Sequence, residues 1–268
     1  MGRGRAAALG GAAVLLAAVT VTPIATLSAH YSLTAHLLQV TVVMGFVPPL
    51  LLIGLGDQIR LSAGRIAAAA GRFLVHPATA IVLVNVVFFG WHATPLYETC
   101  LEHEELYALQ VVTLLLVSLV FWWPIVDPQR KGVLSPFFKL GYILLATIPQ
   151  TFAGLTFALA THPFYSAYAA APPVIGSGAL PDQQIAGACM ALLSKIALFA
   201  AFSVVLLRML GEGEADDATG DDGGHGRGRD DDDAPLPVPP STPAWLGLLE
   251  SGPIADEPAA PRERVGAR

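Results

Sequence analysis

Six long apolar runs constrain this chain more than any other feature of its sequence. A helix that crosses a bilayer needs about 20 mostly apolar residues. Charged residues make up only 13% of the chain, about half of their share in soluble proteins, so too few are present to cover a water-exposed surface. We therefore predict an all-α, polytopic membrane bundle of about six transmembrane helices in a lipid bilayer. The runs are residues 8–28, 34–55, 73–91, 105–126, 137–160 and 183–207.

The basic residues flanking these runs predict the orientation of the bundle. Loops on the cytoplasmic side of a membrane carry an excess of Lys and Arg. The loops 29–33, 92–104 and 161–182 contain neither residue, so we expect them to be external and both termini to be cytoplasmic, in the cell (inner) membrane. The basic residues that flank the other ends of the runs are Arg3, Arg5, Arg60, Arg65, Arg72, Arg130, Lys131, Lys139 and Arg208.

The chain divides into three predicted parts. Residues 1–30 form the first transmembrane helix, although Arg3 and Arg5 before an apolar run also fit a signal peptide; we favour an uncleaved helix. Residues 31–210 form the rest of the membrane bundle, in which the polar stretch 57–71 suits a short interfacial helix. Residues 211–268 have 5 basic and 14 acidic residues, a net charge of −9, with eight prolines and ten glycines. This composition predicts a disordered cytoplasmic tail.

Five of the seven histidines fall in or beside the three loops that lack basic residues. Polar residues continue from them along the helices, because Gln39 shares a face with His36 and Asn85 shares one with His92. Polar groups in hydrocarbon usually face the interior of a bundle. The pattern predicts a polar funnel that is open to the outside and lined by the second, third, fourth and sixth helices. The five histidines are His30, His36, His92, His103 and His162.

This combination of side chains favours copper. Imidazole, thiolate and thioether groups together suit copper, and the sulfur ligands favour Cu(I). Two alternatives that involve no metal stay open. Histidines near headgroups also act as interfacial hydrogen-bonding anchors, and Asp182 after Pro181 fits an N-cap of the sixth helix. Imidazole pairs also bind haem iron, but clustering at the rim disfavours a b-type cytochrome. The candidate ligands are His36, His92, His103 and Met190, with Cys189, His162 and Asp182 as secondary candidates.

Two further features concern the membrane interior. Lys195 follows Gln183 by 12 residues, which puts it about 18 Å into the membrane. We expect its charge to face the interior of the bundle, with Gln150, Asn85 or trapped water as partner. The prolines at 48, 49 and 149 are predicted to kink the second and fifth helices.

Several short motifs occur in an order and spacing that resemble the CtaG-like cytochrome c oxidase assembly protein family, over about residues 30–205. One departure stands out, because many members have a second histidine four residues after the first, where this chain has Val40. The motifs are HLLQ (36–39), PPL (48–50), HP (76–77), WHATPLY (91–97), His103, FWWPI (121–125), PFY (163–165) and DQQIAG (182–187), followed by Met190.

The resemblance implies a membrane factor that assists maturation of haem–copper oxidases through copper delivery at the external face. Cytochrome c oxidase subunits would be its partners, and we expect neither an enzymatic activity nor a nucleic-acid partner. The alternative is a small membrane transporter or channel for metal ions or another solute that uses the same funnel. The family's motif residues match His36, His76, His92, His103, Asp182, Gln183 and Met190.

Overall fold

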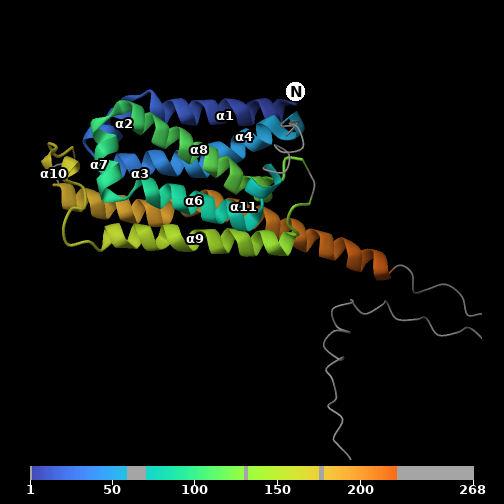
Figure 1. The fold of residues 1–268 in the computed structure, drawn as a ribbon. Helices are drawn as coiled ribbons and strands as arrows, with labels where there is room; N and C mark the ends of the chain where they lie inside the picture. Colours follow the sequence, from blue (N-terminus) through green and yellow to red (C-terminus); the bar gives the residue numbers. More distant parts are fainter. Residues whose placement is uncertain (1, 59–70, 130–131, 175–177, 222–268) are drawn as a thin grey trace, which may run out of the picture. The chain divides into compact units, whose positions relative to one another are not determined.

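The computed structural model describes residues 2–58, 71–129, 132–174 and 178–221. Every regular element in these ranges is a helix, which confirms the predicted all-α fold (Figure 1). Four helical stretches of the described residues are long and apolar enough to cross a membrane, and the number rises to six if each of two bent helix pairs counts as one span. We therefore describe the chain as a multi-pass membrane protein. The four are Leu33–Leu55, Glu104–Val126, Pro136–Ala158 and Ala179–Gly211.

The first predicted run is two helices rather than one. Helix α1 (Arg3–Thr20) and helix α2 (Pro23–His30) meet at a bend of 49°. Pro23 lacks a backbone N–H and cannot continue the hydrogen bonding of α1, while the Thr22 side chain caps α2 by accepting from the Ile24 N–H. The single apolar run 8–28 did not predict this break.

The second run is continuous but contains a π-helical turn. It consists of α3 (Leu33–Thr41), the π turn Val42–Phe46 and α4 (Val47–Leu55). Pro48 has no N–H to donate to the Met44 carbonyl, and the Trp122 indole N–H donates to that carbonyl instead, at 2.9 Å. The wider π turn and the hydrogen bond from the indole allow the helix to continue through Pro48 and Pro49, where we expected a kink.

Helix α1 packs along α4, and hydrogen bonds join the start of α1 to the end of α4. The Arg5 guanidinium donates to the Gly54 and Leu55 carbonyls, at 3.2 and 2.5 Å, and so satisfies acceptors that the end of α4 leaves open. A Cβ at Gly54 would lie 2.5 Å from Leu9. The side chains of this first span are therefore fitted to the bundle.

The remaining spans pair in the same antiparallel manner. Helix α6 (Pro77–Trp91) bends by 66° into α7 (Thr94–Glu102), and α8 (Glu104–Val126) returns beside it. Helix α9 (Pro136–Ala158), which contains Pro149, is followed by the short α10 (Ser166–Ala170) and by α11 (Ala179–Asp221). The stretch 94–102, expected to be part of a loop, is helical. The α7 and α10 helices lie at one end of the bundle (Figure 1).

Two glycines let α9 and α11 touch backbone to backbone. A Cβ at Gly154 would lie 2.7 Å from the Gly187 carbonyl oxygen, and a Cβ at Gly187 would overlap the Gly154 carbonyl and the Ala158 nitrogen. Small residues allow this close approach between membrane helices, where van der Waals contact is a main stabilising force. The contact fixes the start of α11, and with it Gln183 and Met190, against the end of α9.

Helix α11 continues to Asp221, ten residues beyond the predicted start of the tail at residue 211. Residues 59–70 of the predicted interfacial helix and residues 222–268 of the predicted tail lie outside the described ranges.

The bundle has two ends of different composition. The histidine end holds His36 and His92, and the basic end is the opposite one, which holds Arg5, Lys139 and Arg208.

Candidate functional site

Two of the predicted ligands, His36 and His92, meet inside the bundle. His36 lies in the first turn of α3, and His92 follows the last residue of α6. Their Nε2 atoms are 3.3 Å apart, and their side chains are 0% and 8% exposed. The predicted open funnel is thus wrong at this point, because the pair is closed off from the surface. We call these two side chains the histidine pair.

A hydrogen-bond chain orients the His36 ring. The Gln39 amide donates to the Val19 carbonyl at 2.7 Å, which turns the amide oxygen toward Tyr107. The Tyr107 hydroxyl donates to that oxygen at 2.5 Å. Its single proton is then used, so the contact of 3.1 Å between Tyr107 and His36 Nδ1 requires Nδ1 to be the donor. A neutral His36 therefore keeps an unprotonated Nε2, which faces His92.

A backbone carbonyl orients the His92 ring in the same sense. His92 Nδ1 lies 2.7 Å from the Phe88 carbonyl oxygen, which can only accept, so Nδ1 carries the proton. The ring also stacks on Phe88, with centroids 4.2 Å apart. In the neutral state, both Nε2 atoms of the pair present lone pairs to each other. Such an arrangement repels unless a cation, either a proton or a metal ion, lies between the two nitrogens.

Three tyrosines cover the pair at the histidine end. The Tyr97 ring lies 4.8 Å from His36 and 5.6 Å from His92, between centroids. The Tyr97 and Tyr168 hydroxyls are 2.7 Å apart, and Tyr168 donates to the Ser28 carbonyl at 2.5 Å. Tyr165 donates to the His92 carbonyl at 2.8 Å. Tyr97 therefore packs against both imidazole rings of the pair.

Burial keeps Tyr165 and Tyr168 in their protonated, donating form. Desolvation raises the pKa of Tyr165 and of Tyr168 well above its ordinary value. Both hydroxyls can therefore serve as donors throughout the physiological pH range. The motifs WHATPLY and PFY include Tyr97 and Tyr165 but predicted no role for either, because the contacts of this cover join segments as far apart as Ser28 and Tyr168.

Asp182 binds a helix rather than facing the pair. Its carboxylate accepts from the Ser32 hydroxyl at 2.8 Å and from the Leu33 N–H at 2.7 Å, both at the start of α3. Since α11 begins at Ala179 and Asp182 lies in its first turn, the alternative that Asp182 is the N-cap of its own helix does not hold. It caps α3 instead, one turn before His36, and so helps to position that ring.

The other predicted site residues lie away from the pair. His103 is exposed and precedes α8. His162 is exposed and stands edge-on to Phe164. His76 is at the far end of α6, at its N-cap. Gln183 holds the 162–164 loop, accepting from the Phe164 N–H and donating to the His162 carbonyl. No group of three or more His, Cys, Asp or Glu side chains suited to a metal occurs among the described residues.

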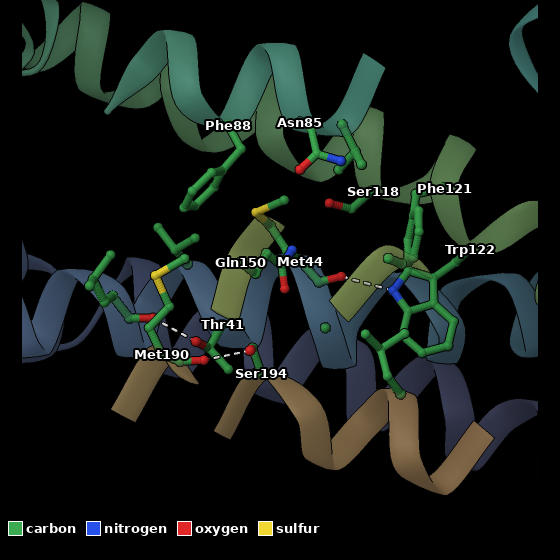
Figure 2. Close-up of a pocket in the computed structure, with 16 residues that line it drawn as sticks. Thr41, Met44, Asn85, Phe88, Ser118, Phe121, Trp122, Gln150, Met190 and Ser194 are labelled. Carbon is green, nitrogen blue, oxygen red and sulfur yellow. Dashed lines mark hydrogen bonds between the residues drawn. The ribbon is translucent and has the colours of Figure 1, made fainter. Parts of the chain in front are cut away.

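Met190 lines a small cavity, of about 40 Å³, in the bundle (Figure 2). The cavity adjoins the histidine pair, because its lining includes Leu37, next to His36, and Phe88, which stacks on His92. A second thioether, from Met44, lines it as well; sequence reasoning missed Met44, which carries no motif signal. Cys189 is half-buried and is not part of the lining. The polar lining residues are Thr41, Asn85, Ser118, Gln150 and Ser194.

Two polar side chains on α8 lack partners near this cavity. Ser118 Oγ and both amide atoms of Gln110 are buried without a hydrogen bond among the described residues. Ser118 lines the cavity, and Gln110 lies one turn beyond Tyr107 on the same helix. Unpaired buried polar groups cost free energy. Ser118 Oγ therefore leaves one polar atom of the cavity lining open to a polar guest such as water.

Lys195 has a simpler partner than we expected. Its Nζ donates to Ser194 Oγ at 2.9 Å, and Ser194 in turn donates to the Met190 carbonyl at 2.5 Å. The predicted partners Gln150 and Asn85 do not bond to it; Asn85 instead donates to the Ile81 carbonyl. The charge is half-buried and is linked to the cavity lining through Ser194.

The family of the chain follows from comparison with known proteins. The family model described as "Cytochrome c oxidase caa3 assembly factor (Caa3_CtaG)" matches residues 2–212. Searches of curated proteins and of solved structures give no match. The matched range covers well over half of the 268 residues and includes the histidine pair, its tyrosine cover and the cavity. The chain therefore belongs to the cytochrome c oxidase caa3 assembly factor family.

Proposed function

We propose that this protein binds copper as cargo at the histidine pair and delivers it to cytochrome c oxidase subunits on the external side of the cell membrane. The observation that carries the proposal is the pair of Nε2 atoms that face each other at 3.3 Å, and the hydrogen-bond partners of both Nδ1 atoms favour the tautomer in which Nε2 is free to bind a metal. Membership of an oxidase assembly family supplies the context. The role requires binding and release, not catalysis.

The donor set suits Cu(I). Imidazole nitrogens are good copper ligands, and a metal–imidazole bond is about 2 Å long. Two such bonds in line would separate the nitrogens by about 4 Å, against the present 3.3 Å. Copper binding thus requires a small outward movement of the rings. The bonds from His36 to Tyr107 and from His92 to Phe88 would hold both rings in the metal-binding tautomer.

The thioethers offer a second position for copper. Met190 and Met44 line the cavity beside the pair and are soft ligands that favour Cu(I). Copper held by the two imidazoles would pass to the oxidase by exit through the histidine end, where Tyr97, Tyr165 and Tyr168 now cover the pair. Those tyrosines must move for copper to leave.

A complementation assay tests the role. In a strain that lacks the gene, wild-type protein should restore oxidase activity, haem a content and oxidase copper. His36→Ala and His92→Ala should each fail to restore oxidase copper at normal protein abundance, and each should weaken Cu(I) binding by at least tenfold, since each removes one of two ligands. His103→Ala is the matched control: an exposed histidine at the same end, expected to behave as wild type. Equal loss in all three would contradict the pair as the site.

The external location needs its own test. We infer it from the lack of Lys and Arg in the loops at the histidine end and their presence at the basic end. Glu102→Cys and Arg72→Cys place a thiol on an exposed residue at each end. A membrane-impermeant maleimide applied to intact cells should label Glu102→Cys and spare Arg72→Cys. The reverse labelling would show that the histidine end is cytoplasmic and would rule out external delivery.

A further inference from the structure

A second, larger hollow lies near the basic end. It is a groove of about 600 Å³ between α4, α8, α9 and α11, a volume in the range of small-molecule sites. Most of the lining is apolar. Two lining residues are cationic, Lys139 at the start of α9 and Arg208 on α11, and none is acidic. The apolar lining includes Phe46, Ile53, Trp122, Ile196 and Val204.

The groove runs from the basic end to the middle of the membrane. Along α11 its lining extends from Arg208 to Ile196, 12 residues apart, which is about 18 Å of helix. The hydrocarbon of one leaflet is about 15 Å deep. The groove therefore spans one leaflet, with its cations at headgroup level and its apolar part at the depth of the acyl chains.

The two cations are available to a ligand. Lys139 is half-buried and Arg208 is exposed, and neither forms an ion pair within the described part of the chain. Long basic side chains at the ends of membrane helices extend toward the headgroups while their stems cover apolar surface. Two cations at the mouth of an apolar groove match a phosphate that carries acyl chains.

We propose that this groove is a binding site for an anionic phospholipid, with the phosphate between Lys139 and Arg208 and an acyl chain along α11. The acidic tail of the chain has the right charge for the cations but cannot fill the apolar part, because an extended peptide in hydrocarbon would leave its backbone groups unpaired. The proposal is independent of copper. It assigns the groove a lipid from the leaflet at the basic end.

Lipid retention by the purified full-length protein tests the assignment. The protein is exchanged into nanodiscs of phosphatidylcholine with 10% phosphatidylglycerol, extracted in mild detergent, and analysed by native mass spectrometry. We expect about one phosphatidylglycerol per chain, well above its share of the bilayer. The double variant Lys139→Gln/Arg208→Gln should retain at least fivefold less. Arg72→Gln, which removes an exposed charge at the same end but outside the groove, should retain as much as wild type.

A steric variant checks the groove itself. Ala200 lines the groove and is exposed, so Ala200→Trp should fill it and lower retention without any change of charge. Retention that is equal for phosphatidylcholine and phosphatidylglycerol, or unchanged in the double variant, would overturn the proposal. Phosphatidylglycerol that binds only after truncation at Gly213 would also overturn it, because the tail would then be the occupant in the intact chain.

Discussion

Removal of the Asp182 carboxylate separates a structural role from a metal-binding one. In the structure, this carboxylate accepts from the Ser32 hydroxyl at 2.8 Å and from the Leu33 N–H at 2.7 Å, with a weaker contact to the Thr34 N–H at 3.4 Å. It therefore caps α3 from another helix. Asp182→Ala removes these contacts and leaves the donors at the start of α3 to find water, one turn before His36.

The expected loss of stability is about 2–3 kcal/mol. Ser32 keeps its own N-cap bond to the Ala35 N–H, so the loss is that of the hydrogen bonds to a charged group, each about 1.5–3 kcal/mol. The two short bonds together should contribute less than their sum, because Asp182 is only half-buried and water can replace part of what is lost. Asp182→Asn keeps one acceptor oxygen, and its loss should be roughly half as large.

Unfolding by SDS in mixed micelles, followed by tryptophan fluorescence, measures this free energy. Glu102→Ala is the matched control, because Glu102 is an exposed carboxylate at the same end, and it should lie within about 0.5 kcal/mol of wild type. Cu(I) binding by Asp182→Ala should weaken only modestly, through looser placement of His36. Unchanged stability together with abolished copper binding would refute the capping argument and make Asp182 a ligand.

Three further variants test the packing and the interior of the bundle. Val40→His places an imidazole one turn below His36, on the cavity wall, and should tighten Cu(I) binding about tenfold or more in a competition titration; unchanged affinity would show that position 40 cannot reach the metal. Gly187→Val should destabilise the protein by at least about 3 kcal/mol in the same SDS assay, because its Cβ overlaps backbone atoms, whereas Gly141→Ala, with open space around it, should be neutral. Lys195→Met should insert normally and support oxidase maturation, since a charge near the bilayer centre costs about 2.5–3.5 kcal/mol; failed maturation at normal abundance would make the lysine functional.

The helical spans were predictable because each depends on a local property, a run of apolar residues long enough to cross a bilayer. The breaks within these spans were harder to predict from the sequence. Pro23 ends α1, whereas Pro48 and Pro49 stay within one span, because the Trp122 indole takes over the Met44 carbonyl. That rescue depends on a helix far away in sequence. Proline positions alone therefore did not show which prolines break a helix.

The site was predictable in part for the same reason. Helical spacing placed His36 and Gln39 on one inward face, and the structure joins them through Tyr107 in one hydrogen-bond chain. Spacing did not reveal that His103 stays at the surface while His92 turns inward, because the bend between α6 and α7 decides that. It also did not reveal the cover over the pair. Contacts such as that of Tyr168 with Ser28 join residues 140 positions apart.

X-ray absorption at the copper edge tests the central claim most directly. The purified protein, loaded with one equivalent of Cu(I), should show a first shell of about two imidazole nitrogens near 2 Å and no sulfur, and His92→Ala should lose that signature. A first shell dominated by sulfur would move the cargo to the thioethers of Met44 and Met190. A nitrogen shell that persists in His92→Ala would contradict the histidine pair as the copper site.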